Sequence, residues 1–527
     1  MRKANSRRMV FLFFSVLICS NGLAQKPRPA RPNFVFILVD DLGYSDLGCT
    51  GSRFYETPNI DKLAGQAAKF TKAYATCQVC SPSRASILTG AYPTRHGITD
   101  YLGAPTGTAW RKLERYTKLL PAVYQPQLAL EYLTFPEVLK QNGYKTFFAG
   151  KWHLGDKGFL PEQQGFDVNK GGNNKGFPEN YFSPYSNDQL EDGPPGENLD
   201  MRLADETVKF ITANKQHPFL VYLSFFAVHS PIQTTETKWK YYRDKAEQQG
   251  LKPGGFKMER RLPVRQQQDN PVYAGLVSTM DDAVGKVLTA LEKLKLDQNT
   301  VVIFTSDNGG VVSGDNFSTS LLPLRGGKGY QWEGGVRVPL LIKVPWLTKK
   351  PLTVDVPVSG IDFFPSILAL ANINSTPVHQ VDGTSIVPLL ENKKIPERPL
   401  YWHYPHYGNQ GGDPSSILQS GTWKLIHYWE DDKNELYDLK SDVNEERDLA
   451  AVHPAIAEKM YNQLSTWLKD TKALFPVKDP DYDAQKEELY RDKVINEIWP
   501  RQEKIRCDML EKGWKPNKNW WNSQPGN

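Results

Sequence analysis

The segment around Cys80 has the residue types of a nucleophile presented at the start of a helix. Residues 80–84 read Cys-Ser-Pro-Ser-Arg, and a short, partly apolar stretch follows that ends at Gly90, a residue type that often terminates helices. A helix N-terminus offers free N–H groups and the positive end of the helix dipole, and both favour negative charge. The segment therefore predicts that Cys80 and Arg84 act together on an anionic group.

Asp40, Asp41, Asp307 and Asn308 are candidate metal ligands. All four offer only oxygen atoms, which favours a hard cation, Ca²⁺ ahead of Mg²⁺, over zinc. An Asp-Asp pair alone is more typical of a solvated loop, but the second Asp-Asn pair favours a metal site. Adjacent strand residues point to opposite faces, so Asp40 and Asp41 can share a metal only if the chain turns there, which Gly43 would permit.

Polar segments follow four predicted strands. Continuous apolar runs predict buried strands over residues 33–39, 145–149, 219–226 and 300–305. The polar segments that follow them are 40–41, 150–155, 229–231 and 306–310. Ligands of open α/β sheets bind at the carboxyl ends of the strands, so we expect the four segments to form one site.

The wider pattern of strands and helices predicts an α/β fold. Amphipathic or apolar stretches predict helices over 59–70, 135–141 and 276–294, and a further strand over 338–344. Alternating elements of this kind predict a large domain with a mixed, mostly parallel sheet sandwiched by helices.

A polar stretch over 392–399 separates a second region. Short strands are expected over 400–404, 416–419, 423–428 and 435–439, and a helix over 455–469, which predicts a smaller C-terminal α+β domain with an antiparallel sheet. We place the large domain at 25–395, the smaller domain at 396–475 and a tail at 476–527. The tail should carry a helix around 485–497 and pack on the body.

Residues 1–24 have the features of a secretory signal. A charged start precedes an apolar core from Met9 to Ile18, and small residues stand before a cleavage point between Ala24 and Gln25. The alternative is an uncleaved membrane anchor, but the run is shorter than the roughly 20 residues that a span needs. We therefore expect export to the periplasm or the medium, without stable membrane insertion.

The charge of the remaining chain argues against a nucleic-acid partner. The formal charge is +5, and the leader carries four of the positive charges and no acid, so only +1 remains. The chain has five cysteines, too few for a disulfide scaffold. Cys49 and Cys77 could pair, whereas Cys80 should stay outside any bridge.

The motifs together resemble those of the type I, formylglycine-dependent sulfatases of the alkaline-phosphatase-like superfamily. The segments that carry the resemblance occur in the family's order and cover roughly residues 33–440. They are 38–43, 80–84 with 88–90, 150–155, 305–309, and Lys328 with 333–339. The resemblance implies an alkaline-phosphatase-like fold and hydrolysis of sulfate esters. It also implies that a maturation enzyme converts Cys80 to formylglycine, whose hydrate would serve as the nucleophile.

The resemblance further implies a role for each motif residue. The modified Cys80 would complete the metal ligand set, and Arg84 would stabilise its ionised form. Lys151 and Lys328 would bind sulfate oxygens. His229 would be the general acid for the departing alcohol, and His153 the base for the elimination step.

The substrate is expected to be a sulfated carbohydrate, with galactose or N-acetylgalactosamine sulfates as first candidates. Residues 402–407 are rich in aromatic and imidazole groups, which suits either a sugar-binding wall or a core at the domain junction. His406 in this run and Asp100 are the expected substrate contacts, and residues 171–175 are either a pocket wall or an ordinary loop.

Two other functions stay open at this stage. A formylglycine-dependent phosphonate or phosphodiester hydrolase could use the same fold. A catalytically inactive sugar-binding relative is disfavoured, because the chain keeps the full set of catalytic candidates: Cys80, Arg84, Lys151, His153, His229 and Lys328.

Overall fold

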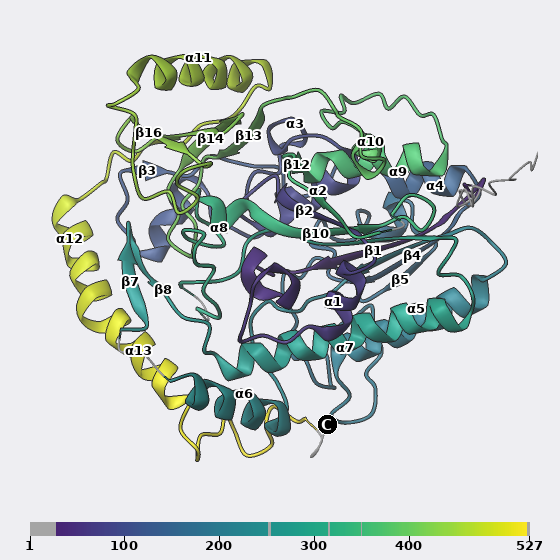
Figure 1. Cartoon of the computed structure of the whole chain (residues 1–527). Helices are drawn as coiled ribbons and strands as arrows, with labels where there is room; N and C mark the ends of the chain where they lie inside the picture. The colour runs from purple at the N-terminus through teal and green to yellow at the C-terminus, as the bar shows by residue number, and fades with distance from the viewer. Residues whose placement is uncertain (1–27, 251–253, 315–316, 349, 524–527) are drawn as a thin grey trace, which may run out of the picture.

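A nine-stranded sheet forms the centre of the described part of the chain (Figure 1). The structure is a computed structural model and describes residues 28–250, 254–314, 317–348 and 350–523. The predicted leader, residues 1–24, lies outside them. The strands, in spatial order, are β11 (Leu352–Val354), β2 (Ala68–Tyr74), β10 (Arg337–Lys343), β9 (Thr300–Ser306), β1 (Asn33–Val39), β6 (Phe219–Ser224), β4 (Lys145–Gly150) and β5 (Val168–Lys170), with β12 (Val358–Ser359) beside β2.

The sheet is mixed and mostly parallel, as predicted. β1 pairs with β6 and β9 in parallel, and β4 pairs with β6 and β5 in parallel. β10 runs antiparallel to both β9 and β2. The carboxyl ends of β1, β4, β6 and β9 therefore lie along one edge of the sheet.

Helices cover both faces of the sheet. Val35 and Ile37 of β1 belong to the core shared with α1 (Pro58–Ala64), α5 (Leu199–Asn214) and α7 (Pro271–Lys293). Phe36 and Leu38 belong to the opposite core, shared with α2 (Cys80–Thr89), α4 (Phe135–Gln141) and α9 (Phe363–Ala371). Alternate side chains of a strand point to opposite faces, so a strand covered on both sides must be apolar throughout.

A four-stranded antiparallel sheet forms the C-terminal region. Its strands are β13 (Leu400–Tyr404), β14 (Ser415–Ser420), β15 (Trp423–Tyr428) and β16 (Lys433–Asp438). The helix α11 (Pro454–Asp470) covers its outer face (Figure 1). On the inner face, Trp402 and Ile417 share a core with Tyr330 and Trp332 of the large domain. The antiparallel sheet and the helix of this region match the predicted α+β domain. The predicted limits of that domain, residues 396 and 475, stay predictions.

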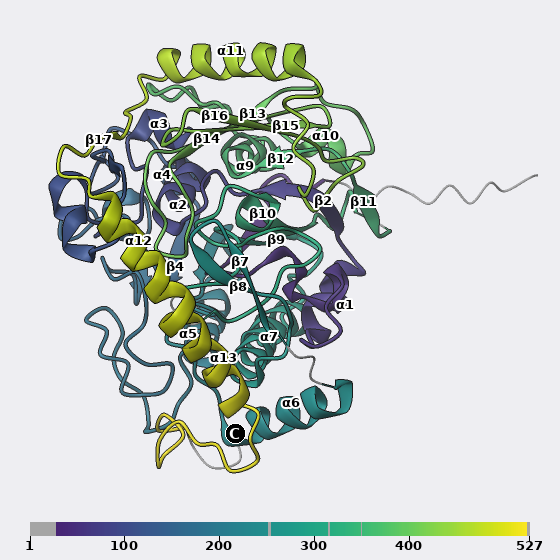
Figure 2. The ribbon, with the colours of Figure 1, turned by 90° about the vertical axis from the view of Figure 1, so that its left-hand side faces the viewer.

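The tail runs along the outside of the large domain (Figure 2). It contains α12 (Ala484–Lys493), a π-helical segment (Val494–Ile498) and α13 (Trp499–Asp508), so the helical stretch is longer than predicted. The Trp239 indole of α6 (Glu236–Gln249) donates to the Met509 carbonyl at 2.9 Å. Arg506 forms an ion pair with Asp269 at 2.7 Å. These contacts fix the tail on the body.

One sequence-based expectation is wrong. The helix predicted over 59–70 ends at Ala64, and residues 68–74 form β2 instead. Pairing with β10 and β11 outweighs the helical spacing of the apolar residues there. The pairing of Cys49 and Cys77, which the sequence left open, does not occur: both are free thiols, and they pack in different hydrophobic clusters. No helix among the described residues has the length and hydropathy of a membrane span.

Candidate active site

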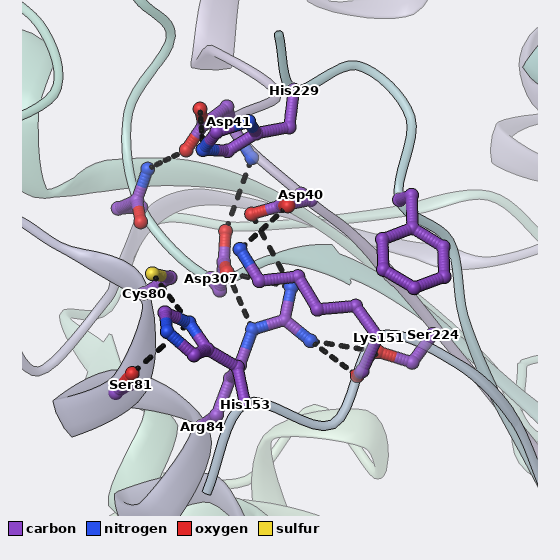
Figure 3. Close-up of polar contacts among 12 residues, drawn as sticks. Asp40, Asp41, Cys80, Ser81, Arg84, Lys151, His153, Ser224, His229 and Asp307 are labelled. Atoms are coloured by element: carbon purple, nitrogen blue, oxygen red, sulfur yellow. Dashed lines mark hydrogen bonds and ion pairs between the residues drawn. The ribbon is translucent and has the colours of Figure 1, made fainter. Parts of the chain in front are cut away.

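Four strand ends and one helix start meet at a single site, as the sequence predicts (Figure 3). β1 leads into Asp40-Asp41, β4 into the segment of Lys151 and His153, β6 into the loop of His229, and β9 into Asp307-Asn308. The helix α2 adds Cys80 and Arg84 from its first two turns. The adjacent parallel strands bring together residues that lie up to 268 positions apart in the chain.

Three carboxylates and one amide form a group that could hold a metal ion. Asp40, Asp41 and Asp307 each place an oxygen within 4.8 Å of the others, and all three are buried. The Asn308 Oδ1 is also buried and has no hydrogen-bond partner among the described residues. An unpartnered buried oxygen beside three carboxylates fits the ligand preference of a hard cation.

The turn that lets both aspartates face this site occurs at Asp41 and not at Gly43. Asp41 has a left-handed φ of 60°, whereas Gly43 has an extended φ of −71°. A left-handed non-glycine residue costs about 1 kcal/mol and is often found at functional sites. Gly43 is needed for space instead, since a Cβ there would lie 2.1 Å from a methyl carbon of Leu321.

Two buried lysines neutralise two of the carboxylates. The Lys151 Nζ lies 2.7 Å from Asp40, and the Lys328 Nζ lies 2.8 Å from Asp41. Burial raises the pKa of Asp40 well above its usual range, although Lys151 acts in the opposite direction. Burial also acts to raise the pKa of Asp41, but Lys328 and His229 outweigh it and the pKa is lowered.

Arg84 ties three strand ends together (Figure 3). Its Nε donates to Asp307 at 2.8 Å, and its Nη1 donates to the Lys151 carbonyl at 2.9 Å and to the Ser224 hydroxyl at 2.7 Å. Ser224 in turn donates to the Lys151 carbonyl at 2.7 Å. Burial acts to raise the pKa of Asp307, but Arg84 lowers it below its usual value. Ser224 carries no signal in the sequence, because it is an ordinary residue at the end of β6.

His153 faces the side chain of Cys80. Its Nδ1 lies 3.4 Å from the Cys80 Sγ and 3.2 Å from the Ser81 Oγ. Its Nε2 lies 3.0 Å from the Leu102 carbonyl, an acceptor, which assigns the ring proton to Nε2. Burial and the Lys151 charge hold the pKa of His153 well below its usual range. A neutral imidazole with its lone pair on Nδ1, where the Ser81 hydroxyl also lies, can accept a proton from residue 80.

His229 is held on the other side of the acid group. Its Nδ1 lies 2.8 Å from the Ser230 carbonyl, and its Nε2 lies 3.5 Å from Asp41. The Tyr181 hydroxyl donates to the His229 carbonyl at 2.9 Å and so fixes the loop. Burial and the Lys328 charge lower the pKa of His229 to about 3. Tyr181 was not predicted, because its role arises only from this contact between distant segments.

The two predicted substrate contacts lie in a buried polar cluster. The Tyr404 hydroxyl donates to Asp100 at 3.0 Å, and the His406 Nδ1 lies 3.6 Å from the same carboxylate. The His406 Nε2 lies 2.9 Å from the Thr99 hydroxyl, and burial raises the pKa of Asp100 to about 8. Trp402, Tyr404, His406 and Tyr407 are all buried, which favours the domain-junction interpretation of this run. Substrate binding by Asp100 and His406 stays a prediction.

The loop after β5, predicted as a pocket wall or an ordinary loop, borders the site. The backbone N–H of His153 donates to the Asn173 carbonyl at 3.0 Å. The Asn173 side chain is itself tied to Asp188 at 2.5 Å. Residues 171–175 therefore lie directly against the backbone of the candidate base.

Known proteins match both the sequence and the fold. The profile of the sulfatase family matches residues 32–373, and the profile of the N-sulphoglucosamine sulphohydrolase C-terminal region matches residues 327–473. A protein from Formosa agariphila named sulfatase is 31% identical, over 89% of this chain and 94% of its own length. The N-acetylgalactosamine-6-sulfatase of Canis lupus familiaris is 28% identical, over 79% of this chain and 75% of its own length.

A solved structure agrees with these matches. The crystal structure of Ps i-CgsB in complex with k-i-k-neocarrahexaose superposes with a TM-score of 0.69 at 25% identity, covering 90% of this chain and 99% of that one. The family profile spans well over half of the chain, and the predicted alkaline-phosphatase-like α/β fold is confirmed. This chain belongs to the sulfatase family and is a sulfuric ester hydrolase.

Proposed function

We propose that this protein removes sulfate from carbohydrates with residue 80 as formylglycine and with Ca²⁺ bound by the acid group. The single observation that carries the proposal is the burial of Asp40, Asp41, Asp307 and the unpartnered Asn308 Oδ1 within one site that also holds the Cys80–His153 contact. Four oxygen ligands suit Ca²⁺ better than zinc, and Mg²⁺ is the second choice because it demands stricter octahedral geometry.

The formylglycine and the cation would supply the nucleophile and the charge stabilisation. When bound, the cation would lower the pKa of a nucleophilic oxygen and withdraw charge from the sulfate group. A thiolate at position 80 is a poor partner for a hard cation, whereas a hydrated formylglycine offers oxygen. The Cys80 position at the N-terminus of α2 would also favour negative charge there.

The chain's own residues would bind the ester and move the protons. Lys151 and Lys328 are buried cations at 2.7 and 2.8 Å from the acid group, and in the complex they would bind sulfate oxygens. His229 would give a proton from Nε2 to the departing alcohol in its doubly protonated form, because its Nδ1 proton is held by the Ser230 carbonyl, and the bound sulfate anion would favour that form. His153 would accept a proton at Nδ1 from a hydroxyl of residue 80, because its Nε2 is held by the Leu102 carbonyl.

The relatives support a carbohydrate substrate. One relative is named N-acetylgalactosamine-6-sulfatase, and Ps i-CgsB was crystallised with k-i-k-neocarrahexaose. We therefore propose sulfate esters of N-acetylgalactosamine and galactose as the first candidate substrates. A formylglycine-generating enzyme would modify Cys80 before export. The leader would then be cleaved between Ala24 and Gln25 as the protein is exported.

The test is sulfate release from a panel of sulfated mono- and oligosaccharides. The protein should be produced with a maturation enzyme and supplied with Ca²⁺, and free sulfate should be measured by ion chromatography. We expect at least one galactose or N-acetylgalactosamine sulfate to be cleaved. Cleavage of a phosphonate monoester or phosphodiester in preference to every sulfate would contradict the proposal.

A further inference from the structure

One dipeptide in the loop after β5 contacts both active-site histidines. A Cβ at Gly176 would lie 2.6 Å from Cε1 of His153, so the Gly176 backbone lies directly on the His153 ring. The next side chain, Phe177, lies parallel to the His229 ring, with 15° between the planes and 6.4 Å between the centroids. The candidate base and the candidate acid therefore contact adjacent residues of the same loop.

Side-chain amides hold this loop in place. Asn173 donates to Asp188 at 2.5 Å and Asn174 donates to Asp156 at 2.9 Å. The Asn187 amide donates to the Gly171 carbonyl at 3.0 Å. A loop fixed at several points loses little further conformational entropy when a ligand binds, so it can present a preorganised surface.

Phe177 is the exposed apolar group of this region. Its relative exposure is 49%, whereas the neighbouring His153 and the acid group are buried. Single exposed apolar side chains are common on protein surfaces and need no function. Phe177 differs because it is stacked on the candidate general acid and its loop is pinned against the candidate base.

We propose that Phe177 is a specificity-determining residue against which the ring that bears the sulfate ester stacks. The inference rests on the proposed function and narrows its substrate class to sulfate esters of flat or chair-shaped rings. A ring offers a broad apolar face to the phenyl group, and an aromatic platform gains from contact area and a defined stacking geometry. An acyclic alkyl sulfate has the same anionic head but no such face.

The test compares two phenylalanines of similar exposure. Phe177→Ala removes the platform, and Phe475→Ala is the matched control, since Phe475 is 41% exposed and packs on His403, outside the catalytic group. The ring probes are 4-nitrophenyl sulfate and N-acetylgalactosamine 6-sulfate, the acyclic probe is hexyl sulfate, and inorganic sulfate serves as a competitive inhibitor.

We expect Phe177→Ala to lower kcat/KM for the ring esters by about 10- to 100-fold, mainly through KM. Hexyl sulfate turnover and the inhibition constant of inorganic sulfate should change by less than about twofold, and Phe177→Tyr should restore the ring preference. Phe475→Ala should behave like the parent. An equal loss for all probes, or no loss for the ring esters, would overturn the inference. A parent enzyme that cleaves none of the sulfates would instead refute the proposed function.

Discussion

The Cys80 thiol lies 3.4 Å from Nδ1 of His153, and the opposite ring nitrogen of His153 lies 3.0 Å from the Leu102 carbonyl. The carbonyl can only accept, so the lone pair of the neutral ring is on Nδ1, which faces the Cys80 thiol and the Ser81 hydroxyl. The helix α2 and the segment after β4 thus define both the reacting position and the direction in which a proton would leave it.

Replacement of the nucleophile gives the most direct prediction. Cys80→Ser should abolish turnover but still bind substrate, because a serine can take the sulfate group yet has no second hydroxyl to expel it. Mass spectrometry of the parent peptide should show an aldehyde in place of the thiol after coexpression with the maturation enzyme. Cys507→Ser, at an exposed thiol away from the site, is the control and should stay fully active. Full activity of the Cys80 variant would refute the mechanism.

The sequence predicts well which side chains lie together in the candidate site, because most of them follow strand ends. Asp40-Asp41 and Asp307-Asn308 stand immediately after apolar runs whose parallel pairing fixes where they meet. Ser224 and Phe177 carry no comparable signal, since one is an ordinary strand end and the other an ordinary loop residue. Their contacts depend on packing between segments that are distant in the chain.

The same limit explains the wrong helix boundary. The apolar spacing over 59–70 is compatible with a helix, but Phe70 is buried as part of β2. Pairing of β2 with β10, β11 and β12 decides the outcome, and none of these strands is close to it in sequence. Local periodicity therefore locates the element but not its end.

Arg84→Lys should destabilise the protein by about 3 to 5 kcal/mol. A lysine cannot bond Asp307, Ser224 and the Lys151 carbonyl at once, so buried partners would be left unpaired. Urea denaturation followed by fluorescence measures the loss. Arg95→Lys is the control, because the Arg95–Asp382 pair is partly exposed and should lose about 1 kcal/mol at most. Equal losses in both variants would contradict the role of Arg84.

Removal of the cation should lower both activity and thermal stability. Without the cation, the negative charges of Asp40, Asp41 and Asp307 repel one another with less compensation. In addition, a ligand present at 100 times its dissociation constant stabilises the folded protein by about 3 kcal/mol, and this contribution is lost when the cation is removed. Dialysis against EDTA, with elemental analysis to verify removal, should reduce Tm and abolish sulfate release. Ca²⁺ should restore both more fully than Mg²⁺. A verified metal-free protein with full activity would refute the metal site.

Asp281 should make stability depend on pH. It accepts hydrogen bonds from the backbone N–H groups of Asn59 and Ile60 at the start of α1, and burial raises its pKa from 3.8 to about 6. The folded state then binds this proton more tightly than the unfolded state, so the free energy of unfolding falls as pH rises from about 4 to about 6 and is flat above.

The matched variant isolates this contribution. The asparagine in Asp281→Asn cannot titrate. Between pH 4 and pH 6 the free energy of unfolding of this variant should therefore fall by up to about 3 kcal/mol less than that of the parent. Urea denaturation of both proteins at several pH values gives the difference. Two parallel curves would show that Asp281 does not titrate in this range.

Gly176→Ala should impair catalysis without unfolding the protein. The new Cβ would lie 2.6 Å from Cε1 and 2.8 Å from Nε2 of His153, so the imidazole must move away from Cys80. A displacement of the base should lower kcat by about 10- to 100-fold while Tm changes little, because the loop keeps its asparagine contacts. Gly513→Ala is the control, since no atom lies within 4 Å of a Cβ there. An unchanged kcat in Gly176→Ala would show that the His153 ring can shift freely, and the position of His153 would then not be set by this loop.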